Sequence, residues 1–161
     1  MIGFLTRLFT RHDAALSEAT PREAGAIAAL HAASFRRGWS DQEVEGLLTD
    51  RNVIAQRALV GRTFAGFIMS RLAADEAEIL SVAVARNCQG RGLARQLLDL
   101  HLRRLAGLGV RTVFLEVDEH NAPAIGLYSR GGFREVSRRE NYYPQPGGKT
   151  AAALVLRRDI G

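Results

Sequence analysis

Apolar residues near the start of the chain recur at helical spacing. One stripe runs through Ile27 and Leu30, and a second occupies residues 44–48. Each stripe follows a residue type that caps helices, first Thr20 and then Ser40, with a glutamate three positions later. This arrangement is the capping-box signature of a helix start. We therefore predict two helices in the first third of the chain.

The hydrophobic period then changes from helical to alternating. Turn-like segments separate short apolar or alternating runs at residues 53–55, 58–60, 64–69 and 77–84. Runs of this length are typical of strands in a sheet meander.

An apolar stripe of alanines and leucines predicts the longest helix over residues 92–108. The opposite side of this helix carries Arg95, Asp99 and Arg103. His101 is expected on the helix surface.

The remaining chain alternates between strand and helix. Residues 112–117 are apolar on both faces, as in a strand buried between two layers. Asn121 and the pair Gly131-Gly132 suit the start and end of a short helix. Two closing strands follow near residues 133–143 and 151–156. This order predicts an α/β fold of the mixed α+β kind, in which a mixed sheet carries helices on both faces.

Length and composition favour a single globular domain. The chain has 161 residues, of which 47% are apolar and 24% charged, enough for a sizeable core. A single cysteine and the lack of a long apolar run favour a cytoplasmic protein outside the membrane. We expect residues 1–13 to form an N-terminal extension and residues 14–161 to form the domain.

The net charge of +5 favours anionic partners such as a phosphorylated cofactor. The arginines are scattered without interleaved aromatic residues, so direct nucleic-acid binding is not expected. The four histidines lack the spacing of metal ligands, and no metal site is predicted.

A glycine-rich turn precedes the longest helix. Gly90 and Gly92 let backbone amides approach a ligand, and the helix start adds partial positive charge that favours an anion such as pyrophosphate. A connection without any ligand is the alternative. Two features argue against a dinucleotide-binding fold. Arg95 stands where its motif has the third glycine, and too little chain follows to form the second half of its sheet.

The run Gln89-Gly90-Arg91-Gly92-Leu93-Ala94 resembles the cofactor signature of the GNAT acetyltransferases. Within that superfamily the chain is most similar to the ribosomal-protein-alanine N-acetyltransferases of the RimI type. The likeness spans roughly residues 14 to 158 and rests on five further segments. These are Trp39-Ser40, Val82-Ala83-Val84, Leu115-Glu116-Val117, Leu127-Tyr128 with Gly132-Phe133, and Asn141-Tyr142-Tyr143-Pro144.

The resemblance implies a mostly antiparallel mixed sheet in the order β-α-α-β-β-β-α-β-α-β-β, with acetyl-CoA as co-substrate. It further implies that Val82, Ala83 and Val84 bind the pantetheine arm and acetyl group through their backbone. The pyrophosphate would be held by Gly90, Arg91, Gly92, Leu93, Ala94 and Arg95. Asn121 would hydrogen-bond the cofactor, Glu116 would be the general base and Tyr128 the general acid.

The residue chemistry is consistent with those roles. An amine attacks a thioester only as the free base, and an α-amino group loses its proton about 3 kcal/mol more easily at neutral pH than a lysine does. A single carboxylate is a plausible general base for an α-amino group, and a phenol can donate a hydrogen bond to the departing thiolate.

Other roles for these residues remain open at this stage. Glu116 could be a solvated strand-end carboxylate, and Tyr128 could pack in the core or against a cofactor. Tyr142 and Tyr143 could line a peptide channel or close the last hairpin.

The expected function is acetylation of the N-terminal alanine of a ribosomal protein by direct transfer in a ternary complex, by a monomer or weak dimer. Alternatives are a GNAT enzyme acting on lysine or a small amine, and a non-catalytic acyl-CoA sensor. Residues 148–152 depart from relatives of this type, which often carry an acidic residue there.

Overall fold

A computed structural model describes residues 14–161, so the predicted extension at residues 1–13 lies outside the described residues. The predicted order β-α-α-β-β-β-α-β-α-β-β is confirmed, with short 3-10 turns (η) between some elements. The helices and strands are β1 Ala15–Glu18, α2 Ala24–Ser34, α3 Asp41–Thr49, β2 Val53–Val60, β3 Thr63–Ala73, β4 Glu76–Val84, α4 Leu93–Gly107, β5 Thr112–Asp118, α5 Ala122–Arg130, β6 Arg134–Pro144 and β7 Thr150–Asp159.

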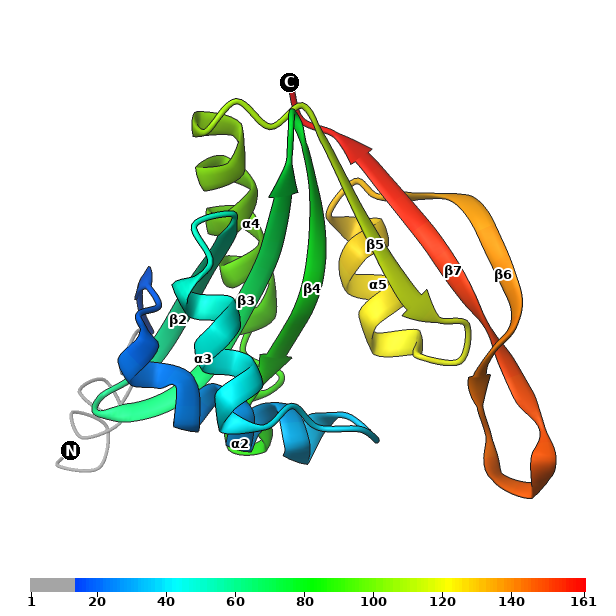
Figure 1. Cartoon of the computed structure of the whole chain (residues 1–161), viewed down its shortest axis with the longest axis horizontal. Helices are drawn as coiled ribbons and strands as arrows, with labels where there is room; N and C mark the ends of the chain where they lie inside the picture. Colours follow the sequence, from blue (N-terminus) through cyan, green and yellow to red (C-terminus); the bar gives the residue numbers. More distant parts are fainter. Residues whose placement is uncertain (1–13) are drawn as a thin grey trace, which may run out of the picture.

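The strands form one sheet in the order β1-β2-β3-β4-β5-β7-β6. Every neighbouring pair is antiparallel except β4 and β5, which are parallel. Helices α2 and α3 cover one face, called here the α2/α3 face, and α4 and α5 cover the other, the α4/α5 face (Figure 1). The expected mixed sheet with helices on both faces is therefore confirmed.

Strands β4 and β5 separate partway along their length. They pair only from Glu76 with Thr112 to Ile79 with Leu115, after which they diverge (Figure 1). A register shift in the β3–β4 pairing leaves Leu80 without a partner on β3, which is a β-bulge. Beyond the bulge β4 pairs with β3 alone among the described residues. We call the resulting gap the strand split.

Local sequence signals explain where several helices begin. Ser40 Oγ accepts a hydrogen bond from the Glu43 N–H at 3.1 Å, and Asn121 Oδ1 accepts one from the Ala124 N–H at 3.2 Å. Both side chains satisfy amides that a helix start leaves without a partner. The predicted caps of α3 and α5 are thus confirmed.

The turn-like segment expected between residues 53–55 and 58–60 is absent, because β2 is continuous from Val53 to Val60. Polar residues between the two runs suggested a turn, but both are satisfied inside the sheet. The Gln56 amide donates to Glu18 at 3.2 Å, and Arg57 forms an ion pair with Glu23 at 2.7 Å.

The placement of His101 on the helix surface was also wrong, because this side chain is fully buried under the sheet. It forms hydrogen bonds with Gln56 and, at 2.5 Å, with Ser70 Oγ. Burial lowers the pKa of His101 to about 3, so the ring is neutral at physiological pH. A neutral imidazole with both nitrogens engaged can replace an apolar residue in the stripe of α4.

Candidate active site

Glu116 lies on β5 at the strand split. Its neighbours Leu115 and Val117 pack in the apolar cluster of the α4/α5 face. Because side chains alternate along a strand, Glu116 points to the α2/α3 face. Its carboxylate is 24% exposed and lies 3.2 Å from Arg139 Nη1 on β6, so it is a half-buried group with a charged partner.

Two tyrosines of β6, Tyr142 and Tyr143, lie near Glu116 and Arg139. Ala153 of β7 is opposite both Asp118 and Arg139, and Ala151 is opposite Tyr143, so Tyr143 lies on the face of Glu116 and Arg139. Burial raises the pKa of the Tyr143 phenol, and the carboxylate of Glu116 adds to the rise. Tyr142 is exposed and lies against the Arg139 guanidinium at 5.5 Å. The irregular pairing of β6 with β7 between Arg139 and Tyr143 includes Asn141 at a φ of 55°. Tyr143 therefore belongs to the site, and Tyr142 lies at its rim.

The β6–β7 hairpin is tied to both neighbouring segments. Arg36, in the loop between α2 and α3, donates to the Pro144 carbonyl at 2.7 Å. Gln145 donates to the Asp118 carboxylate at 3.2 Å. These bonds bring the α2–α3 loop, the end of β5 and the hairpin together on the side where Glu116 lies. Sequence reasoning missed Arg36 and Arg139, since neither belongs to a motif and their partners are distant in the chain.

Tyr128 lies on the opposite face, in α5. Its side chain is 5% exposed, and its ring meets Phe133 edge-on at 5.5 Å. No described residue hydrogen-bonds its hydroxyl, which is not fully enclosed. Burial raises the pKa of this phenol, so it is a neutral hydrogen-bond donor at physiological pH. Tyr128 is a core tyrosine whose hydroxyl remains available.

The predicted acyl-binding residues form the free edge of β4. Ala83 and Val84 are buried and Val82 is partly buried, so their side chains pack within the protein. On the side of the split, their backbone groups have no strand partner among residues 14–161. Such an edge can pair with an extended amide-containing ligand as another strand would.

The turn before α4 has the conformation its glycines predicted. Gly90 and Gly92 have φ values of 76° and 77°, in the left-handed region that favours glycine. Gly92 caps α4, so the next amides have no partner within the helix and can face an anion. Gln89 Nε2 donates to the Val84 carbonyl at 3.0 Å, which fixes the turn to the end of β4.

The other predicted residues of this turn differ in which of their groups can contact a phosphate. Leu93 is buried in the core and Ala94 is half-buried, so only their backbone amides are suitable for a phosphate. Arg91 is exposed, whereas Arg95 forms an ion pair with Asp99 at 2.9 Å. Asn121 uses its Oδ1 as a helix cap, which leaves its amide nitrogen as the donor for a ligand.

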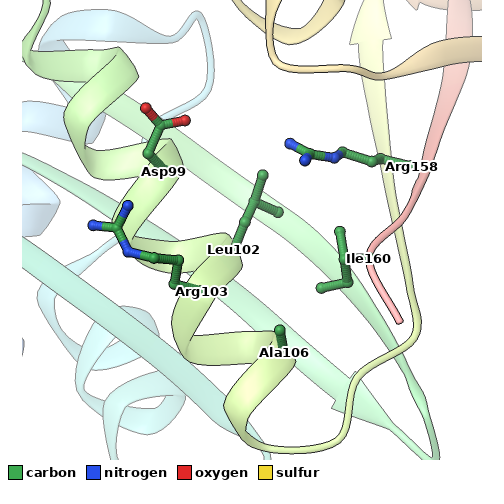
Figure 2. Close-up of a pocket in the computed structure, with 6 residues that line it drawn as sticks. All are labelled: Asp99, Leu102, Arg103, Ala106, Arg158 and Ile160. Atoms are coloured by element: carbon green, nitrogen blue, oxygen red, sulfur yellow. The ribbon is translucent and has the colours of Figure 1, made fainter.

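Two cavities lie outside the predicted site residues, none of which lines either of them. A groove of about 460 Å³ lies on the α2/α3 face and includes Leu80 at the bulge. It is lined by Trp39, Glu43, Gly46, Leu47, Asp50, Arg71 and Leu80. A second cavity of about 300 Å³ lies between α4 and the end of the chain (Figure 2). None of the predicted site residues lines it, so it is separate from the candidate site.

Within residues 14–161, no helix has the length and apolar character needed to cross a bilayer. The same residues contain no group of three or more histidine, cysteine, aspartate and glutamate side chains arranged to hold a metal ion.

Known proteins are similar to this chain in sequence and in fold. The chain matches the acetyltransferase (GNAT) family over residues 24–133. It is 35% identical over 117 residues to the ribosomal protein bS18-alanine N-acetyltransferase of Escherichia coli strain K12, which covers 73% of this chain and 78% of that enzyme.

Among solved structures, the ribosomal-protein-S18-alanine N-acetyltransferase from Escherichia coli aligns with a TM-score of 0.86 at 28% identity, over 92% of this chain and 95% of that one. Arabidopsis thaliana NAA60 in complex with acetyl-CoA shares the fold, with a TM-score of 0.80 at 20% identity over 92% and 99% of the two chains. The chain belongs to the acetyltransferase (GNAT) family and is an N-acetyltransferase.

Proposed function

We propose that this enzyme acetylates the α-amino group of a ribosomal protein that begins with alanine, using acetyl-CoA. The observation that carries the proposal is the strand split, where β4 has a free edge next to Glu116 of β5. Tyr128 packs in the cluster of the opposite face. The likeness to bS18-alanine N-acetyltransferases supports the choice of acceptor, and a ribosomal acceptor implies a reaction in the cytoplasm.

The residues at the split suit coenzyme A. Its pantetheine arm contains amides that can pair with backbone groups of Val82, Ala83 and Val84 at the strand edge, where the Val84 carbonyl already accepts a hydrogen bond from Gln89. Its pyrophosphate suits the amides and positive end of α4 in the segment Gly90 to Arg95. Acetyl-CoA supplies the acetyl group as a thioester.

Glu116 acts as the general base. An α-amino group has a pKa near 8, so most of it carries a proton at pH 7 and must lose that proton before attack. The half-buried carboxylate of Glu116 lies on the open polar face and accepts this proton, directly or through water. Arg139 beside it limits the motion of the carboxylate.

Tyr128 assists the leaving thiolate from the other face. Because burial raises the pKa of this phenol well above that of an alkyl thiol, near 8.5, full proton transfer to the sulfur is uphill. Its main contribution is a hydrogen bond to the developing thiolate.

Acetyl transfer is direct, in a ternary complex. The chain contains one cysteine, Cys88, and that side chain is buried in the cluster of the α4/α5 face. A buried thiol without a neighbouring base is a poor nucleophile. The acceptor amine, on the α2/α3 face, and the thioester, at the split, therefore meet without a covalent enzyme intermediate.

Release of free thiol from acetyl-CoA tests the proposal. The acceptors are a peptide starting Ala-Arg-Tyr, the same peptide with a blocked N-terminus and one internal lysine, and the polyamine spermidine. We expect thiol release with the first peptide and at least tenfold lower kcat/KM with the other two. Preference for lysine or spermidine would support the alternative acceptors. Cofactor binding without turnover on any amine would support an acyl-CoA sensor.

A further inference from the structure

The Ser81 hydroxyl is buried without a partner. It is the one enclosed side-chain oxygen or nitrogen among residues 14–161 that has no hydrogen bond, in a residue that is 6% exposed. Burial of an unpaired hydroxyl is unfavourable, and most buried polar groups in folded proteins are paired. A feature that lowers the stability of the free protein calls for another explanation, such as a partner supplied by a ligand.

Its position is at the strand split. Pairing of β4 with β5 ends at Ile79 and Leu115, and Glu116 is the next residue of β5. Ser81 is opposite Met69 on β3, just past the bulge at Leu80. Met69 packs in the cluster of the α2/α3 face, and residues opposite one another share a face. Continued from the last pair, the parallel register puts Leu80 level with Glu116. Ser81 is therefore one residue further along β4, beside the split and on the same face as Glu116.

Ser70 provides a comparison on the neighbouring strand. It too is buried, but its hydroxyl is 2.5 Å from His101 Nε2 on the α4/α5 face. The sheet therefore satisfies a buried serine hydroxyl on the face away from Glu116 and leaves one unsatisfied on the face of Glu116.

We propose that Ser81 binds the attacking amine and relays its proton to Glu116, an inference that rests on the proposed function. The Ser81 oxygen accepts a proton as the N–H bond of the ammonium breaks, while the serine's own proton passes to the Glu116 carboxylate. The amine becomes neutral, the carboxylate becomes protonated and the serine is unchanged. The relay requires rotation about χ1, between staggered positions, to turn the enclosed hydroxyl towards the split.

The test compares Ser81→Ala and Ser81→Thr with the wild type. For Ser81→Ala we expect kcat/KM for the best amine acceptor to fall about 10- to 100-fold at pH 7, the value of one hydrogen bond to a charged group. The loss should shrink above pH 8, where the free amine needs no relay. The melting temperature should stay the same or rise by about 2–4 °C, because an unpaired hydroxyl is removed. Ser81→Thr keeps the hydroxyl and should recover most of the activity.

Ser70→Ala is the matched control, since it removes a paired buried hydroxyl from the adjacent strand. We expect it to lower the melting temperature without changing the shape of the pH–rate profile. The affinity for acetyl-CoA, measured by calorimetry, should stay within twofold of the wild type in both alanine variants.

Two results would overturn the role of Ser81 while leaving the proposed function intact. One is a kcat/KM of Ser81→Ala within twofold of an active wild type. The other is a loss that is equal at all pH values and accompanied by a lower melting temperature. A wild type that acetylates no amine would instead overturn the proposed function, and the role of Ser81 with it.

Discussion

The two faces of the sheet differ sharply in chemistry at the strand split. On the α4/α5 face the residues are buried and mostly apolar, with Tyr128 packed against Phe133. On the α2/α3 face Glu116, Arg139 and Tyr143 form a half-exposed group with charges of both signs. An apolar wall suits an acyl thioester, whereas a polar face suits an ammonium ion that must lose a proton. Under the proposed function, the acetyl donor would bind on the apolar side of the sheet and the acceptor amine on the polar side.

The largest effect is expected from a change on the polar face. Glu116→Gln keeps the shape of the side chain but removes the base, so we expect kcat/KM at pH 7 to fall about 100- to 1000-fold. The loss should be greatest at low pH and should shrink as the amine deprotonates on its own near pH 8. A pH–rate profile of thiol release measures how the loss of kcat/KM changes with pH. A variant profile parallel to that of the wild type would remove Glu116 as the base.

A change on the apolar face should have a smaller effect and leave binding intact. Tyr128→Phe removes one donor while the ring stays packed, so we expect kcat to fall about 10- to 100-fold with an unchanged Kd for acetyl-CoA. Stopped-flow turnover and calorimetry separate the two quantities. Tyr128→Ala is the packing control, expected to lose about 3–5 kcal/mol of unfolding free energy. Equal kcat in Tyr128→Phe and the wild type would exclude a role for the hydroxyl.

The turn before α4 tests whether donor binding depends on backbone conformation. A Cβ at Gly92 would contact nothing within 4 Å, so Gly92→Ala acts only through its φ of 77°. We expect this variant to lose about 1–2 kcal/mol of unfolding free energy and to bind acetyl-CoA more weakly. Gly107→Ala, at the end of α4, also meets no neighbour and should be neutral or slightly stabilising. Unfolding in urea measures the loss of stability, and calorimetry measures the affinity for acetyl-CoA. Identical results for Gly92→Ala and Gly107→Ala would show that the φ of Gly92 does not matter for binding.

The buried network of His101 predicts a pH dependence of stability rather than of catalysis. The pKa of about 3 in the folded state lies below the unfolded value near 6.5. Below pH 6.5 the unfolded chain therefore binds a proton that the folded chain does not, and stability falls as pH falls. Between pH 7.5 and 5.5 this residue should account for a loss of about 1.4 kcal/mol in unfolding free energy.

Urea titrations at the two pH values measure this loss. His101→Gln should show a smaller difference in unfolding free energy between the two pH values than the wild type does. An equal pH dependence in His101→Gln and the wild type would assign the effect to other groups.

Much of the fold could be predicted because local signals agree with the tertiary arrangement. The caps at Ser40 and Asn121 and the stripe of α4 act through neighbours close in sequence. His101 and Gln56 were misjudged for the opposite reason. Each is polar, and each becomes suitable for burial only because a partner 45 positions away in the chain lies beside it.

The candidate site shows the same division. The glycine turn, Glu116 and Tyr128 stand out through residue type and spacing, and their roles remain predictions. The ion pair of Arg139 with Glu116 depends on the order of strands β5, β7 and β6, which no local sequence pattern indicates. The unpaired hydroxyl of Ser81 depends on a bulge whose position follows from the pairing of β3 with β4.

A structure bound to a bisubstrate, in which coenzyme A is joined through an acetyl bridge to the amine of an Ala-Arg-Tyr peptide, tests the central claim most directly. We predict that the sulfur lies within hydrogen-bonding distance of the Tyr128 hydroxyl and that the peptide nitrogen lies on the α2/α3 face near Glu116. A complex with both ends of the ligand on one face of the sheet, or with the sulfur remote from the strand split, would contradict it.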